Sequence, residues 1–263
     1  VAAICMLTAN TAKAQEFTVQ GDIVSSYVWR GYYQGGGAAF QPTLGFGIGN
    51  FYIGAWGSTN FNGGKKELDL SASYTFGENG PTFSLTDYWW KGEAEPSDER
   101  NKYFNYNAHE TNHFFEAGLS YTLPIERFPL SVAWYTMFAG ADKRYDAEGE
   151  EKNNYSSYVE LNYPFVVKSC NLNLTCGFLP YQTNTIYNLP NSGFAVTNIA
   201  LKAMKDIKIN DNFSLPIFVQ GIWNPRYEDA YLVTGNIKHF PARSFVVTPK
   251  EMLDIIHNEY RIY

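Results

Sequence analysis

The chain has 263 residues, of which 20 are basic and 26 acidic, so its formal charge is −6. This acidic balance, with no basic cluster, gives no support for a nucleic-acid partner, and we exclude that class. Aromatic residues make up 17% of the chain and hydrophobic residues 45%, yet the mean hydropathy is −0.30. Past the N-terminus no run of about 18 apolar residues occurs, which excludes a spanning helix. The composition instead favours strands with alternating apolar and polar residues.

The first 14 residues have the order of an export signal. Residues 1–7 are largely apolar, and the small-residue site Ala12-Lys13-Ala14 precedes Gln15. We therefore expect residues 1–14 to be the remaining part of a signal peptide, cleaved after Ala14.

Alternation with a period of two is the main signal from Gln15 onward. In residues 67–76 every second side chain from Leu68 is apolar, and every second side chain from Glu67 is polar; residues 115–123 repeat the pattern. Strands of this kind begin near twelve positions: Phe17, Ala39, Asn50, Glu67, Thr82, Phe115, Pro129, Tyr155, Asn171, Gly193, Phe213 and Glu228. An even count of about 12 predicts an all-β fold, an up-and-down antiparallel transmembrane β-barrel.

The connections between these strands alternate in length. The odd ones are polar and mostly long: 30–38, 91–111, 139–154 and 180–192. The even ones are short and rich in Gly, Asn and Pro: 49–50, 77–81, 124–128 and 205–212. Long outer loops with short inner turns are typical of barrels in the bacterial outer membrane, so we expect that location.

Aromatic residues cluster at the strand ends. The clusters are Tyr27, Trp29, Tyr32 and Tyr33; Tyr88, Trp89 and Trp90; Phe114 and Phe115; and Trp223 and Tyr227. Such clusters predict a girdle at the membrane interface, with cross-strand pairing in a soluble sheet as the alternative.

A C-terminal extension follows the predicted barrel domain of residues 15–235. In this extension, residues 236–263, Thr248-Pro249-Lys250-Glu251 has the pattern of a capping box with proline at the first helical position. We expect a short helix from Pro249 to about Tyr260. The extension is either a periplasmic appendage or the sign of a chain whose true end is missing.

Motifs near both ends of the barrel domain resemble the Gcw-chp family of conserved hypothetical outer-membrane proteins. They are residues 22–31 (DIVSSYVWRG), Gln34, 42–45 (PTLG), 54–58 (GAWGS), 224–225 (NP) and 228–233 (EDAYLV). The resemblance spans residues 15–235 and implies an outer-membrane barrel with no established activity. Residues 236–263 depart from the family pattern, and the family supplies no substrate.

If the apolar faces contact lipid, the polar faces line the lumen. The candidate lumen-lining charges are Asp22, Arg30, Glu67, Asp69, Glu116 and Glu160. Because acids outnumber bases there by five to one, the sequence predicts a mild preference for cations. The alternative is a plugged interior in which Arg30 pairs with a carboxylate across the barrel.

Enzyme and metal sites have weaker support. His109 and His113 have the spacing of a zinc pair on a helix, but 109–113 leads into a strand, where that spacing separates them. His113 could act as a base with Ser or Asp on a neighbouring strand, although no Gly-x-Ser-x-Gly occurs. The acidic residues of 142–154 lack the ligand spacing of a calcium hand. We therefore expect no enzyme activity, cofactor or metal.

The predicted function is the passive passage or binding of small hydrophilic solutes by a porin-like barrel, with outer-membrane lipid as the other partner. One alternative is a structural or surface-interaction barrel with an occluded lumen. The other is a membrane hydrolase at the outer rim. The sequence does not identify the solute.

Overall fold

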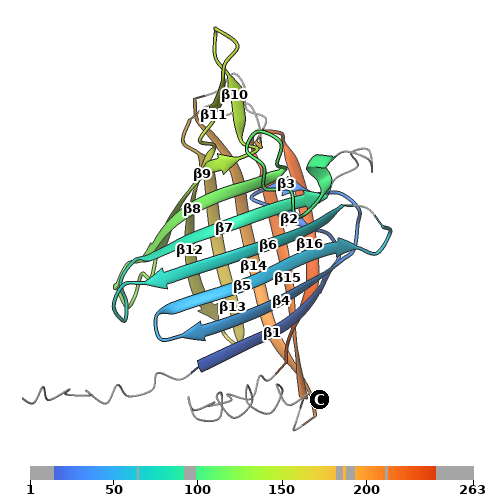
Figure 1. Ribbon diagram of the computed structural model, residues 1–263. Coiled ribbons are helices and arrows are strands. Elements are labelled where there is room, and N and C mark those ends of the chain that lie inside the picture. Colours follow the sequence, from blue (N-terminus) through green and yellow to red (C-terminus); the bar gives the residue numbers. More distant parts are fainter. Residues whose placement is uncertain are drawn as a thin grey trace, which may run out of the picture.

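The computed structural model describes residues 15–63, 65–91, 99–181, 186–187, 193–210 and 213–240. Twelve of its strands form one closed antiparallel barrel, in the order β1-β16-β15-β14-β13-β12-β9-β8-β7-β6-β5-β4 (Figure 1). These strands are β1 (Gln15–Val24), β4 (Ala39–Ile48), β5 (Phe51–Asn60), β6 (Lys66–Thr75), β7 (Thr82–Lys91), β8 (His113–Thr122), β9 (Ser131–Gly140), β12 (Ser157–Val167), β13 (Cys170–Leu179), β14 (Ala195–Asn210), β15 (Phe213–Asn224) and β16 (Asp229–Phe240). Each begins within two residues of its predicted start. The predicted fold class is confirmed.

Short elements lie in the longer connections, at one end of the barrel. They are the hairpin of β2 (Val28–Trp29) and β3 (Tyr32–Tyr33), the 3-10 turn η1 (Glu99–Asn101), and the hairpin of β10 (Lys143–Tyr145) and β11 (Glu151–Asn153), which projects from the top of Figure 1. We call this end the loop end. The opposite end, with connections such as Gly49-Asn50, is the turn end.

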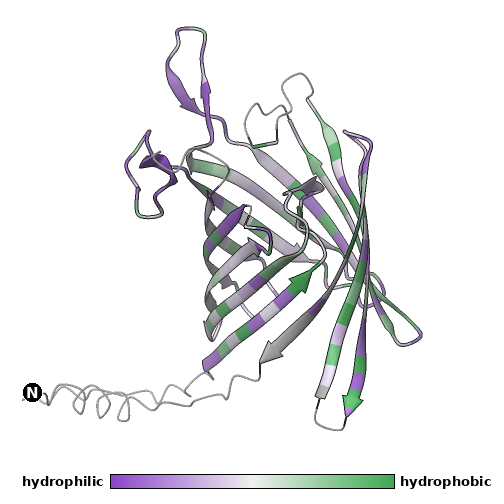
Figure 2. Ribbon diagram, turned by 90° about the vertical axis from the view of Figure 1, so that its right-hand side faces the viewer, coloured by the Kyte–Doolittle hydropathy of each residue, from purple (hydrophilic) through white to green (hydrophobic). Residues whose placement is uncertain are grey.

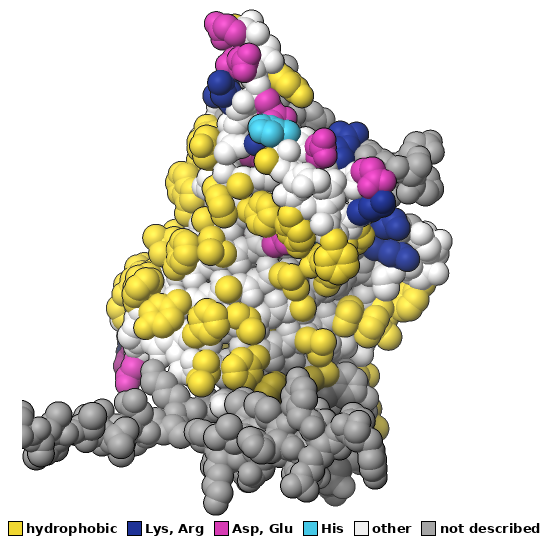
Figure 3. All heavy atoms as spheres, viewed as in Figure 1, with side chains coloured by type: hydrophobic (Ala, Val, Ile, Leu, Met, Phe, Trp, Pro, Cys, Tyr) yellow, Lys and Arg dark blue, Asp and Glu magenta, His cyan; other side chains and the backbone are white. Residues whose placement is uncertain are grey.

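Apolar side chains cover the outside of the wall. Figure 2 shows hydrophobic and hydrophilic residues alternating along the strands, and Figure 3 shows the resulting belt on one side of the barrel. Exposed large apolar residues occur around the barrel, and include Phe17, Ile23, Leu44, Ile53, Leu70, Phe83, Leu119, Trp134, Leu174, Leu201, Val219 and Leu232. No described helix is long and apolar enough to cross a membrane. A continuous apolar surface of this size requires lipid around it, as expected for a transmembrane barrel.

One predicted turn is wrong. Residues 205–212 were expected to form a connection, but β14 continues to Asn210, and its last residues pair with β15 from Lys205↔Ile217 to Asn210↔Phe213. The strand continues because the alternation continues: Ile207 and Ile209 are exposed, like the outward-facing residues before them.

The closing strand is also longer than predicted. The expected boundary of the barrel after Gly235 falls inside β16, because residues 236–240 pair with β1 from Asn236↔Ile23 to Phe240↔Val19. Residues 1–14 and 241–263 lie outside the described part of the chain, so the signal peptide and the C-terminal helix stay predictions.

Candidate functional site in the lumen

A hairpin enters the barrel at the loop end. After Val24 the chain leaves the wall, and β2 pairs with β3 across a two-residue turn, Arg30-Gly31. Both turn residues have positive φ, 52° and 87°, as in the type I′ turns that close tight hairpins. The prediction that 30–38 faces outward is therefore wrong for its first part, because the Arg30 side chain is 8% exposed and contacts the opposite wall.

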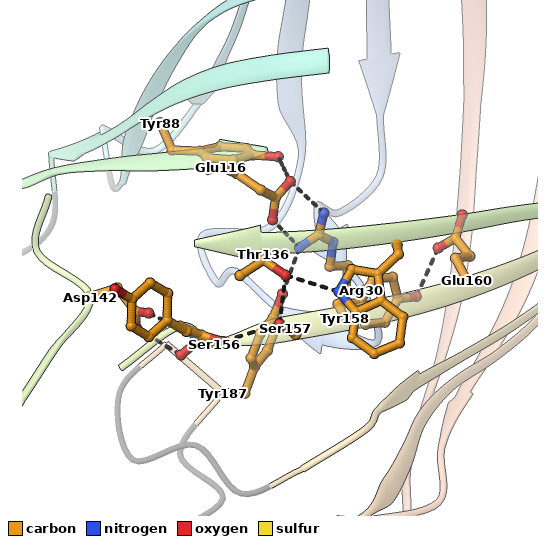
Figure 4. A network of polar contacts seen from close by, with 12 residues as sticks. Arg30, Tyr88, Glu116, Thr136, Asp142, Ser156, Ser157, Tyr158, Glu160 and Tyr187 are labelled. Carbon is orange, nitrogen blue, oxygen red and sulfur yellow. Dashed lines mark hydrogen bonds and ion pairs between the residues drawn. The ribbon is translucent and has the colours of Figure 1, made fainter. Parts of the chain in front are cut away.

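Arg30 forms a two-pronged ion pair with Glu116 of β8. Its Nη1 and Nη2 atoms lie 2.6 and 2.8 Å from the two carboxylate oxygens (Figure 4). The Tyr88 hydroxyl donates a further hydrogen bond of 3.0 Å to Glu116, and Arg30 donates one of 2.6 Å to the Tyr187 hydroxyl. A planar guanidinium suits such a bidentate pair, and a pair removed from water requires this full set of partners.

Aromatic rings enclose the Arg30 guanidinium. Its Cζ atom lies 4.5 to 4.6 Å from the ring centroids of Trp29, Tyr135 and Tyr158. Rings at this distance attract the cation through their faces. Tyr187 stacks on Trp29 at 5.6 Å, and burial raises the pKa of its phenol, so Tyr187 stays protonated in this network.

These contacts show that part of the predicted aromatic girdle is wrong. Trp29, Tyr88 and Trp90 lie inside the barrel and pack against one another, with ring centroids 5.3 to 6.0 Å apart. The alternation of β7 explains this, because Tyr88 and Trp90 lie on the face opposite to the exposed Phe83 and Leu85. The inward rings hold the hairpin rather than anchor the barrel in lipid.

The turn of the hairpin also rests on the wall. The Asn224 side chain donates a 3.0 Å hydrogen bond to the Gly31 carbonyl. A Cβ atom on Gly31 would lie only 1.8 Å from the Thr197 carbonyl oxygen of β14. The backbone therefore approaches the wall as closely as glycine allows.

Gly31→Ala is expected to destabilise the barrel by more than about 1 kcal/mol, because it adds this clash to the cost of a positive φ. The urea midpoint of the protein in lipid vesicles measures the effect. Gly37→Ala is the matched control, since Gly37 also has a positive φ, 70°, but open space around its Cβ position. Equal midpoints for the two variants would contradict the close approach.

The other predicted lumen residues lie on the inner face in separate places. Glu67 and Asp69 are buried neighbours on β6, at 7% and 9% exposure. Glu160 accepts hydrogen bonds of 2.7 Å from Tyr158 and from Asn162. Asp22 accepts one of 2.8 Å from Gln20 on the same face of β1. Of the six predicted charges, the structure pairs only Arg30 with Glu116 by an ion pair between described side chains.

Lys202 is a lumen charge that the sequence analysis missed. It lies on the inner face of β14, with its Nζ atom 4.1 Å from the centre of the Phe218 ring. The sequence does indicate that Lys202 faces the lumen, because Lys202 alternates with the apolar Leu201 and Ala203. With Lys202 added to the six predicted charges, this set has five acids and two bases.

The turn end of the barrel has a polar pocket. It has a volume of about 430 Å³, and its lining includes Glu16, Tyr52, Ser73 and Thr75 from the inner faces of β1, β5 and β6. Water can therefore reach these inner-face side chains at the turn end.

His113 lies on the outer side of the wall, under the connection that follows η1. Its Nδ1 atom is 2.6 Å from Asp87, and its Nε2 atom is 2.6 Å from the Tyr103 carbonyl oxygen, so Nε2 must donate. Asp87 lies on the neighbouring strand β7, so His113 has the kind of partner that a hydrolase would need. However, both ring nitrogens are occupied, and within the described residues no hydroxyl contacts either of them. This arrangement holds the connection on the barrel and leaves no nitrogen free to act as a base.

The acidic connection 142–154 uses its carboxylates for its own structure. Asp142 is 1% exposed and accepts hydrogen bonds from the Ser156 amide and hydroxyl, at 2.8 and 2.7 Å. Asp146 accepts from the amides of Glu148 and Glu150. No group of three or more potential metal ligands occurs among the residues that the structure describes.

Comparisons with known proteins find similar folds at low sequence identity. No family model matches the chain, and no curated protein does. The NanC porin is similar over 84% of this chain and 98% of its own, at 9% identity and a TM-score of 0.48. An outer membrane channel from Pseudomonas putida F1 is similar over 91% of this chain and all of its own, at 10% identity and a TM-score of 0.40. The translocator domain of the autotransporter NalP from Neisseria meningitidis covers 90% of this chain and 91% of its own, at 10% identity and a TM-score of 0.32.

Proposed function

We propose that the protein is a porin-like channel of the bacterial outer membrane, with the loop end facing outward and a lumen that passes or binds small hydrophilic solutes. The observation that carries the proposal is a closed barrel with an apolar outside and a polar, acidic inside. Such an interior favours water and small polar solutes, and its net negative charge favours cations. The hairpin narrows the path and gives it selectivity.

A second candidate is a structural barrel with an occluded lumen. The Arg30–Glu116 pair favours it, because the hairpin crosses the interior and is held at both walls. We also propose that the chain belongs to the Gcw-chp family, on the basis of the motifs in residues 22–31 and 228–233. It agrees with either candidate, since it implies a barrel and no activity.

Liposome swelling separates the two candidates. A channel is expected to admit small sugars, with swelling rates that fall as the sugar becomes larger, because the hairpin limits the cross-section. Empty liposomes and liposomes with denatured protein are the controls. A protein that inserts and remains folded but admits no sugar and carries no ion current would be the occluded barrel.

The cation preference has its own measurement. In a planar bilayer with a KCl gradient, the reversal potential is expected to have the sign of a cation-selective pore. Glu160→Gln removes one lumen carboxylate and should reduce this potential. An anion-selective wild-type pore would contradict the electrostatic part of the proposal.

A further inference from the structure

A pair of lysines lies on the outer face of the wall at the loop end. Lys66 begins β6 and Lys91 ends β7, and the two residues are direct partners in the antiparallel ladder. Both have the outward orientation, because Leu68 and Trp89, two positions away along each strand, also face outward. Both lysine side chains are exposed. Two positive charges therefore lie next to each other outside the barrel.

This lysine pair is unfavourable by itself, since like charges directly opposite each other destabilise a sheet. Among the residues that the structure describes, neither lysine forms an ion pair. The carboxylate of β7, Asp87, contacts His113 and accepts a hydrogen bond of 3.1 Å from the Tyr106 hydroxyl. The lysine pair therefore favours an anion that comes from outside the described chain.

The lysine pair lies at the edge of the apolar belt. The next outward pair of this ladder is Leu68↔Trp89, and Figure 3 shows basic side chains gathered beside the hydrophobic ones on this side of the barrel. Exposed rings adjoin it: Phe61, before β6, is 65% exposed, and Phe104 is 87% exposed. Tyr103, next to Phe104, packs edge-on against Trp89 at 5.4 Å. Exposed rings and basic residues at the end of an apolar belt are typical of the headgroup layer.

We propose that Lys66 and Lys91 bind the phosphate of one lipid headgroup in the leaflet at the loop end. Lysine binds phosphate as a point charge, and opposite Cβ atoms in a ladder are only about 5 Å apart, so both ammonium groups can reach one phosphate. The apolar belt below receives the acyl chains of the same lipid. This proposal goes beyond the channel function, because it depends on the membrane location and not on an open lumen.

The test compares urea unfolding in two kinds of vesicles, phosphatidylcholine alone and phosphatidylcholine with added lipid A, whose sugar headgroup carries phosphate groups. Lipid A is present in both leaflets, so the direction of insertion does not affect the result. A lipid that binds only the folded state stabilises it, so the wild-type midpoint should be higher with lipid A. Inorganic phosphate is added separately to phosphatidylcholine vesicles. An equal shift there would show that the site takes free phosphate, which would overturn the lipid proposal.

Lys91→Gln should have effects of opposite sign in the two kinds of vesicles. In phosphatidylcholine it removes the repulsion from Lys66, so the midpoint should equal or exceed that of the wild type. With lipid A it removes half of the phosphate site, so the midpoint should fall below that of the wild type. Lys152→Gln is the matched control, because Lys152 is also exposed at the loop end but lies 3.7 Å from Asp146. It should keep the wild-type gain from lipid A.

Three results would overturn the proposal. They are no gain of the wild type from lipid A, an equal gain in Lys91→Gln, and a loss of the gain in Lys152→Gln. A Lys91→Gln midpoint that falls equally in both kinds of vesicles would also overturn it, because acidic residues of the chain itself, such as Glu93, would then neutralise the pair. The readout requires no current, so a barrel that binds the lipid but does not conduct would contradict only the channel function.

Discussion

Arg30→Ala is expected to destabilise the folded barrel by about 3–5 kcal/mol, because it leaves Glu116 charged and unpaired inside the wall. Glu116 is 2% exposed, and Arg30 provides two of its hydrogen bonds. The Tyr88 hydroxyl is the remaining donor shown for it, and one neutral donor does not replace a bidentate guanidinium. Urea unfolding in lipid vesicles measures the loss.

The double variant Arg30→Met with Glu116→Gln is the matched control. It removes both charges, keeps similar side-chain volumes, and should recover most of the stability lost in Arg30→Ala. If Arg30→Ala unfolds at the wild-type urea concentration, Arg30 does not hold the hairpin against β8.

Leu70→Arg is expected to cost about 2–4 kcal/mol, the range for an arginine that faces lipid near the middle of the membrane. Leu70 is 42% exposed and lies in the middle of β6, within the apolar belt. The effect comes from placing a charge in acyl chains, since no packed core is disturbed. Unfolding from vesicles measures it.

Ser71→Arg is the control at nearly the same depth. Ser71 is the next residue of β6, so its side chain is on the lumen side. Arginine there meets water and carboxylates and should cost much less. Equal costs at the two positions, or a larger cost at Ser71, would contradict the assigned faces of the wall.

The strands of this barrel could be predicted because alternation is a local property. One strand contains enough residues to show which face is apolar, and lipid contact gives all twelve strands the same rule. The same rule explains the missed end of β14, where Ile207 and Ile209 continue the apolar alternation through residues that were expected to form a turn.

The candidate site could be predicted only in part. The sequence identified Arg30 and Glu116 as lumen charges, and pairing across the barrel was one of the two alternatives. The choice between them depends on two residues 86 positions apart meeting inside a closed barrel. Such a contact follows from the complete set of strand registers and from the path of the first connection, and neither is a local property.

The aromatic clusters were misinterpreted for a related reason. Trp89 and Trp90 are adjacent in the sequence, yet they belong to opposite faces of β7. Clustering alone does not distinguish a ring at the membrane interface from one that packs on an inserted hairpin. The positive φ angles of Arg30 and Gly31 form the tight turn of the hairpin, and the contacts of these residues with Glu116 and Asn224 place it inside the barrel.

The central claim is that the hairpin of β2 and β3 narrows a water-filled lumen. Single-channel conductance tests it most directly, in the wild type and in a variant whose residues 28–33 are replaced by a short Gly/Ser linker. The linker removes the Arg30–Glu116 crossing, so Glu116→Gln is included to avoid an unpaired buried charge. We expect a small conductance in the wild type and a clearly larger one in the variant. Equal conductance in two folded proteins would contradict the claim.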